Sequence, residues 1–166
     1  LADEVKQTNQ QIQCHSSILE SIPDEAYTLH RLLKPIPGSP YFRYNCENLL
    51  PADIVIFAMA LTGRNISSKF KEYFDRRFFM NHVPDLKDKQ VGFLVSGRMS
   101  RMPYLYDFCQ GFFECQQANF AGMVCDETGN SKEIDTCIQK LAEQVIAYST
   151  NDYCQPQTFL GVGGSK

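Results

Sequence analysis

The chain has 166 residues, of which 43% are hydrophobic and 21% are charged, and this is enough to build one domain with a proper core. Its formal net charge of −3 argues against a nucleic-acid binder. No apolar run approaches the roughly 20 residues that a membrane helix needs, and there is no signal-peptide pattern. The composition therefore predicts a soluble, cytoplasmic protein.

Seven cysteines are present, and no two of them have the C-x-x-C spacing of zinc or cluster sites. We therefore expect no metal ligands and mostly reduced, structural thiols. Cys109 and Cys137 are expected on the apolar faces of helices. The alternative is that Cys14 or Cys46 is exposed and redox-active.

The first 50 residues contain few regular elements. Residues 1–8 have the pattern of a helix interior, and residues 11–19 suit a short strand or a strand-to-loop segment. A short helix is possible at residues 24–33, and the proline-rich residues 33–51 are expected to form a loop. Three aromatic residues of this loop either pack on the domain, cover a ring-shaped ligand or seal a dimer interface: Tyr41, Phe42 and Tyr44.

Residues 51–79 have the pattern of a buried strand, a loop and an amphipathic helix. The strand is expected at residues 54–57, with Ser67 or Ser68 as the cap of the helix. A loop at the carboxyl end of such a strand is where open α/β sheets form ligand crevices. The expected loop comprises eight candidate binding residues: Ala58, Met59, Ala60, Leu61, Thr62, Gly63, Arg64 and Asn65.

A second buried strand is predicted at residues 90–96, and it ends in Ser96 and Gly97. Arg98 and Arg101 follow and either hold an anion or are solvated loop charges. Pro103 suits the first position of the next helix. The expected buried stripe of this helix is Leu105, Phe108, Cys109 and Phe112, whereas Tyr104, Tyr106 and Phe113 lie off it. The excess of aromatic residues indicates an oligomer contact, or core packing alone.

A third strand is predicted at residues 119–125, followed by a turn and a helix capped by Ser131. The buried face of that helix is expected to be Ile134, Cys137, Ile138, Leu141 and Val145. The alternation of strands and helices predicts an α/β fold with a parallel sheet, whose loops gather at one edge. We expect residues 1–150 to form the domain and residues 151–166 to form a tail.

Residues 52–76 resemble the third strand, flavin loop and helix of the flavodoxin-like NAD(P)H-dependent FMN reductase superfamily, which includes the iron–sulfur flavoproteins. The matching positions are Ala52, Asp53, Asn65, Ser67, Lys71, Asp75 and Arg76. The resemblance extends more weakly over residues 51–148 and implies a three-layer sandwich around a parallel sheet. In that family a strand and a phosphate loop precede the helix that residues 1–8 resemble. We therefore expect the sequence to lack this first strand, or to join pieces across gaps.

The resemblance implies an oxidoreductase that binds FMN and is reduced by NADPH or NADH. It also implies a homodimer and an iron–sulfur electron partner. The flavin ring is expected to contact main-chain groups of the eight loop residues and of Ser96, Gly97 and Arg98, with no catalytic side chain. Residues 59–62 differ from the Ser-Pro-x-Tyr loop frequent in the family. An electron carrier without a nicotinamide site, or a cofactor-free dimerisation module, therefore remains an alternative.

Overall fold

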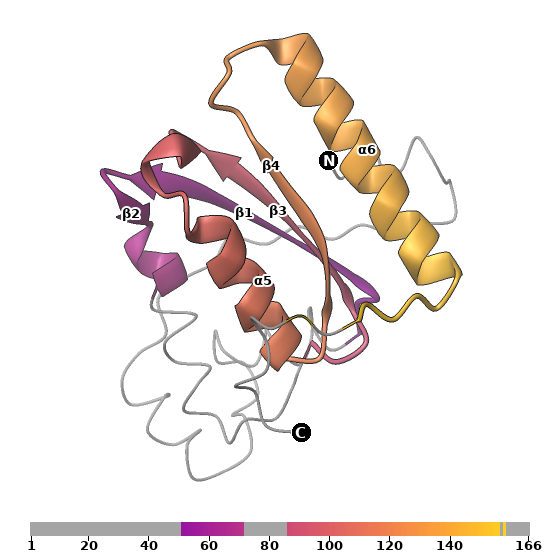
Figure 1. The fold of residues 1–166 in the computed structure, drawn as a ribbon. Helices are drawn as coiled ribbons and strands as arrows, with labels where there is room; N and C mark the ends of the chain where they lie inside the picture. The colour runs from indigo at the N-terminus through magenta and orange to yellow at the C-terminus, as the bar shows by residue number, and fades with distance from the viewer. Residues whose placement is uncertain (1–50, 72–85, 157, 159–166) are drawn as a thin grey trace, which may run out of the picture.

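The computed structural model describes residues 51–71, 86–156 and 158, and it shows an α/β fold (Figure 1). Strands β1 (Ile54–Thr62), β3 (Gln90–Ser96) and β4 (Asn119–Cys125) are parallel. The short strand β2 (Asn65–Ile66) runs antiparallel to β1, which gives the order β2-β1-β3-β4. The expected α/β class is confirmed, and the sheet is mixed because of β2.

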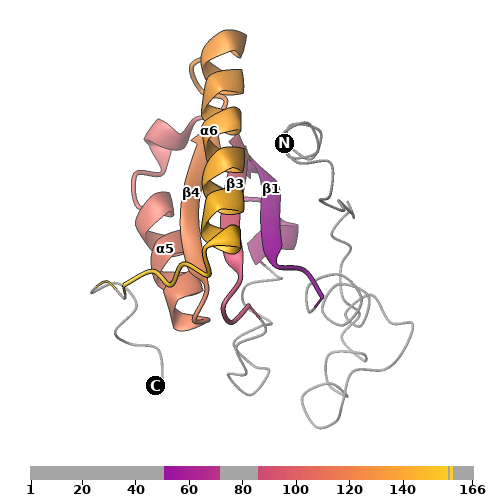
Figure 2. The same ribbon diagram turned by 90° about the vertical axis from the view of Figure 1, so that its right-hand side faces the viewer.

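Helices α5 (Leu105–Cys115) and α6 (Ser131–Thr150) cover opposite faces of the sheet (Figure 2). The sheet side of α6 comes close to β3 at Gly92. A Cβ atom at Gly92 would lie 2.9 Å from Cδ1 of Ile56 and 3.3 Å from Cδ2 of Leu141. A larger residue there would therefore push the helix away from the sheet.

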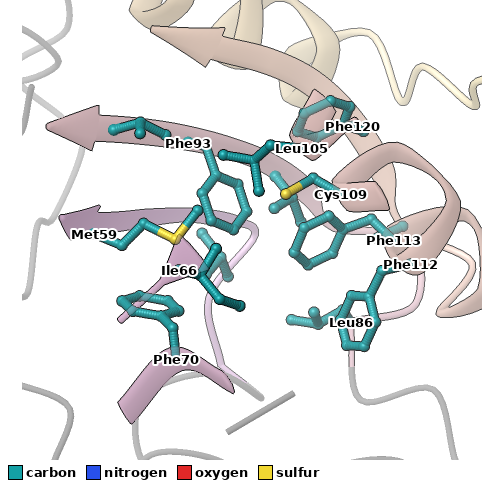
Figure 3. Packing of buried hydrophobic residues seen from close by; sticks show 14 of the residues in the cluster. Met59, Ile66, Phe70, Leu86, Phe93, Leu105, Cys109, Phe112, Phe113 and Phe120 are labelled. Atoms are coloured by element: carbon teal, nitrogen blue, oxygen red, sulfur yellow. The ribbon is translucent and has the colours of Figure 1, made fainter. Parts of the chain in front are cut away.

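The core between α5 and the sheet is built from aromatic rings (Figure 3). Phe113 and Phe93 are both fully buried, and their ring centroids are 5.5 Å apart. Phe113 also stacks on Phe57 at 5.7 Å and on Phe120 at 6.0 Å. One side chain of α5 thus packs against all three parallel strands.

The buried face of α5 differs from the predicted stripe. Phe113 is buried, whereas Phe108 is 41% exposed, so the stripe runs through positions 105, 109, 112 and 113. Both stripes share three residues and have helical spacing, so the sequence alone did not separate them. The helix also begins later than expected, with Tyr104 as its N-cap, so Pro103 lies in the preceding turn.

The prediction of a loop directly after the first strand is wrong for residues 58–62. β1 continues through Thr62, so that Ala58, Met59, Ala60, Leu61 and Thr62 are strand residues. Gly63 and Arg64 form a turn, and Asn65 starts β2. Pairing of residues 61–62 with residues 65–66 keeps the chain extended. The next helix begins at Ser68, so Ser67, one of the two predicted caps, directly precedes it.

Two predictions for α6 are also wrong. Its N-cap is Asn130, whose side-chain oxygen accepts a hydrogen bond from the Glu133 N–H, and not Ser131. Cys137 is exposed, because the buried face runs through Leu141, Ala142 and Val145, with Ile134 and Ile138 half-buried. Cys109 is buried as expected, and this burial raises the pKa of its thiol to about 12.

The segment after α6 is hydrogen-bonded to the domain as far as Thr158. The Asn119 side chain donates to the Tyr153 carbonyl at 2.7 Å and accepts from the Gln155 N–H at 2.6 Å. Thr158 donates through its N–H and its hydroxyl to the buried carboxylate of Glu114. The first half of the expected tail is therefore attached across the amino ends of β3 and β4.

Several predictions concern residues outside the described part of the chain. They are the helix at residues 1–8, the segments at residues 11–19, 24–33 and 33–50, the amphipathic helix beyond residue 71 with Asp75 and Arg76, the tail at residues 159–166, the thiols of Cys14 and Cys46, and the aromatic cluster Tyr41, Phe42 and Tyr44. Among the helices that the structure describes, none has the length and apolar character to cross a membrane.

Candidate functional site

The carboxyl ends of the three parallel strands meet at one edge of the sheet. Ala60 pairs with Ser96, and Val95 pairs with Cys125. Gly97 has a φ of +126° and packs closely on Leu61, because a Cβ atom there would lie 3.1 Å from Cβ of Leu61. Candidate residues that are about 35 positions apart in the sequence are thus brought into contact.

A cleft of about 380 Å³ lies along this edge, on the face of the sheet that α6 covers. Four of the candidate residues line it: Ala58, Met59, Ala60 and Ser96. Leu94, Val95, Val124, Ile134 and Ile138 make most of the remaining lining apolar. Cys125 and Asp126 complete the lining at the end of β4.

The other candidate residues do not line this cleft. Leu61 and Thr62 end β1, while Gly63, Arg64 and Asn65 form the exposed hairpin next to it. Gly97 and Arg98 belong to the loop after β3, where Arg98 is exposed. The edge therefore has an apolar hollow on one side and an exposed, partly basic rim on the other.

Asp126 ties the loop after β3 to the end of β4. Its carboxylate accepts a hydrogen bond from the Ser96 hydroxyl and another from the Gly97 N–H, each at 2.7 Å. The Cys125 thiol donates to the Gly97 carbonyl at 3.1 Å. The bond from Ser96, and then the bond from Gly97, hold the pKa of Asp126 below its ordinary value.

Glu127 makes a second connection between the same two loops. Its carboxylate accepts from the Ser100 N–H at 2.8 Å and also from the Ser100 hydroxyl. These bonds lower the pKa of Glu127, and the nearby charge of Arg98 adds to the effect. Ser100 lies in the short 3-10 helix η2 (Met99–Arg101), so Glu127 fixes the segment that carries both arginines.

These two carboxylates were missed at the level of sequence, where residues 126–130 were assigned only to a turn. The available signal was two acidic residues directly after the last parallel strand. Their position changes the expected contacts, since the Gly97 and Ser100 N–H groups already donate within the protein. A ligand in the cleft would meet mainly apolar walls together with Ser96, Cys125 and Asp126, while Arg98 and Arg101 are exposed in the adjoining loop.

The edge is not arranged as a metal centre. Among the described residues, no group of three or more His, Cys, Asp or Glu side chains could hold a metal ion. A mainly apolar cleft with a few polar groups at one end suits an organic ligand.

The chain matches no model of a known protein family and no curated protein.

The hydrogen bonds to Asp126 predict how the loop responds to pH. The pKa of Asp126 is lower in the folded protein than its ordinary value of 3.8, so its bonds stabilise the fold fully at pH values above 3.8. This stabilisation is lost as the pH falls through the lower pKa of the folded state. The amide proton shift of Gly97, followed by NMR, should stay constant at neutral pH and move with a midpoint below 3.8. A midpoint at or above 3.8, or the same curve in Asp126→Asn, would contradict the bond.

Proposed function

We propose that the protein is an FMN-binding, flavodoxin-like oxidoreductase that NADPH or NADH reduces. The observation that supports it best is the meeting of β1 and β3 in a parallel pair, which places Ala60 beside Ser96 and Leu61 against Gly97. Flavin sites in open α/β sheets lie at such an edge. FMN, when bound, supplies the electron-transfer chemistry, and the protein supplies binding and orientation.

The residues at this edge fit FMN in two respects. Apolar side chains such as Leu94, Val124 and Ile138 offer a wall that excludes water from a ring. Arg98 and Arg101 are exposed cations that could pair with a phosphate or with the negative charge of a reduced flavin. Asp126 and Glu127 contribute indirectly, because their bonds hold the loop that carries these arginines.

A cofactor-free flavodoxin-like module is the second candidate, and two observations favour it. The main-chain N–H groups of Gly97 and Ser100 already donate to Asp126 and Glu127. Residues 58–62, expected to form the flavin loop, continue as strand β1. The two candidates differ in whether FMN binds.

Titration of FMN with the purified protein, followed by flavin fluorescence, tests the proposal. We expect saturable quenching, and Arg98→Gln should weaken binding roughly tenfold, because one charge-assisted contact is lost. Lys140→Gln, an exposed change of equal charge on α6, should leave affinity unchanged. Absence of quenching by a folded protein would favour the cofactor-free module. If FMN binds but NADPH and NADH fail to bleach it, an electron carrier for an iron–sulfur partner is the better description.

A homodimer is part of this proposal, and the surface of α5 supports it. Tyr104, Tyr106 and Phe108 are 57%, 39% and 41% exposed. Exposed aromatic groups of this kind are enriched at protein interfaces. Sedimentation velocity should show a dimer that Phe108→Glu shifts toward monomer. A monomer at every concentration would contradict the dimer while leaving FMN binding open.

A further inference from the structure

Strand β4 is the outermost strand on one side of the described sheet, whose order is β2-β1-β3-β4 (Figure 2). The first half of its outer side is covered, because residues 119–121 are buried and the Gln155 side chain accepts a hydrogen bond from the Phe120 N–H. Residues 122–125 are only half-buried. These four residues are the free part of β4.

The free part of β4 carries main-chain groups that point away from the sheet. The Asp126 N–H donates to the Val95 carbonyl at 3.1 Å, so the main-chain groups of Asp126 are directed toward β3. Successive residues of a strand direct these groups to alternate sides, and the register is regular over residues 122–125. The N–H and C=O groups of Met123 and Cys125 therefore point away from β3. Within the part of the chain that the structure describes, none of these four groups has a hydrogen-bond partner.

The sequence of β4 lacks the features that keep outermost strands from pairing. Residues 119–125 contain no charged residue and no proline. The irregularity in the pairing with β3 comes before Gly122, so it does not disturb the free part. An uncharged, regular stretch with unpaired main-chain groups is a template for one more strand.

An exposed aromatic ring lies beside the same strand. Tyr106 of α5 is 39% exposed, and its ring packs edge-to-face on Phe120 of β4, with the centroids 5.2 Å apart. A strand added to β4 would cover part of this ring, and exposed tyrosines are enriched at protein interfaces. The outer side of β4 thus combines free hydrogen-bonding groups with an apolar contact.

We propose that the free part of β4 pairs antiparallel with the same stretch of a second copy of this chain, about a two-fold axis at Met123. This inference rests on the homodimer of the proposed function and specifies its surface. A two-fold axis lets one strand serve as its own partner, and the Met123 residues of the two copies then exchange two hydrogen bonds. Asp126 of one copy lies opposite Phe120 of the other in this register, so no two carboxylates face each other.

Met123→Pro and Met123→Ala separate the main-chain bonds from the side-chain contacts. Both variants remove the same half-buried side chain, but only proline also removes the N–H that points away from β3. In sedimentation velocity, Met123→Pro should weaken the dimer roughly tenfold or more, because two hydrogen bonds across the axis are lost, and Met123→Ala by less than about threefold. Equal weakening by the two variants would overturn the pairing.

Hydrogen exchange of the ¹⁵N-labelled full chain, measured below and above the midpoint of dimerisation, needs no variant and decides the matter even if Met123→Pro does not fold. The Met123 and Cys125 amide protons should exchange roughly tenfold more slowly in the dimer, whereas the Val124 amide proton, already directed toward β3, should change far less. A dimer with unchanged exchange at Met123 would overturn the pairing and leave a homodimer through α5 standing. A monomer at every concentration would overturn both and leave FMN binding open.

Discussion

Replacing Phe113 by Ala should lower the free energy of unfolding by about 3–5 kcal/mol. The side chain is fully buried, and its ring lies 5.5 Å from Phe93, 5.7 Å from Phe57 and 6.0 Å from Phe120. Removing it leaves a cavity between α5 and the sheet. The neighbouring rings belong to three different strands, so they cannot easily move to fill it. Urea unfolding followed by circular dichroism measures the loss.

Phe108→Ala is the matched control for this change. It removes the same side chain from the same helix at a position that is 41% exposed, so the loss should stay below about 1 kcal/mol. If the two variants lost equal stability, or if Phe108→Ala lost more, the buried face of α5 would be assigned wrongly.

Replacing Asn119 by Ala should cost about 2–4 kcal/mol. The Asn119 side chain is 5% exposed and makes two short hydrogen bonds to the segment after α6. Its loss leaves the Gln155 N–H without its acceptor and weakens the hold on Tyr153. The nearby bond from the Phe120 N–H to the Gln155 side chain should weaken as well. Besides the lower stability, faster amide exchange at residues 153–158 is expected.

Asn151→Ala provides the comparison for Asn119. Asn151 is exposed, and its side chain donates to the Ala147 carbonyl within the end of α6. Its replacement should cost less than about 1 kcal/mol and leave exchange at residues 153–158 unchanged. A stable Asn119→Ala protein with unchanged exchange would show that residues 153–158 are not held by these bonds.

The inner strands were the most predictable elements. β3 and β4 coincide with the predicted residues 90–96 and 119–125, because continuous apolar runs bounded by polar residues suit buried parallel strands. β1 was predicted too short. Residues 58–62 are small or weakly patterned, and only their pairing with β3 and β2 keeps them extended. Such pairing with distant residues leaves no local sequence signal.

The errors within helices have a different cause. The sequence of α5 contains aromatic side chains on more than one face, so which of Phe108 and Phe113 is buried depends on how the helix lies on the sheet. For α6, Cys137 has the right spacing for the buried face, but only Leu141, Ala142 and Val145 are fully buried against the sheet. Rotation of a helix is fixed by packing, which a single sequence does not reveal.

The meeting of two predicted segments at one edge was predictable, but their use as a binding site stays a prediction. The rule that the loops after parallel strands gather at one edge brings Ala60 and Ser96 together, and the two residues pair in the sheet. The bonds of Asp126 and Glu127 to the loop after β3 depend on the spacing between β3 and β4. A polar hollow at the amino ends of the strands, around Gln90, had no sequence signal either, because its lining comes from four separate segments.

The measurement that tests the central proposal most directly is a ¹H–¹⁵N spectrum of the labelled protein during titration with FMN. We expect saturable shifts at Ala60, Gly63, Gly97 and Arg98, around the carboxyl ends of β1 and β3. Amide signals of Asp88 and Asp152, at the opposite edge, should stay in place. Shifts confined to that opposite edge, or no shifts at a saturating FMN concentration, would contradict a flavin site at the carboxyl edge of the sheet.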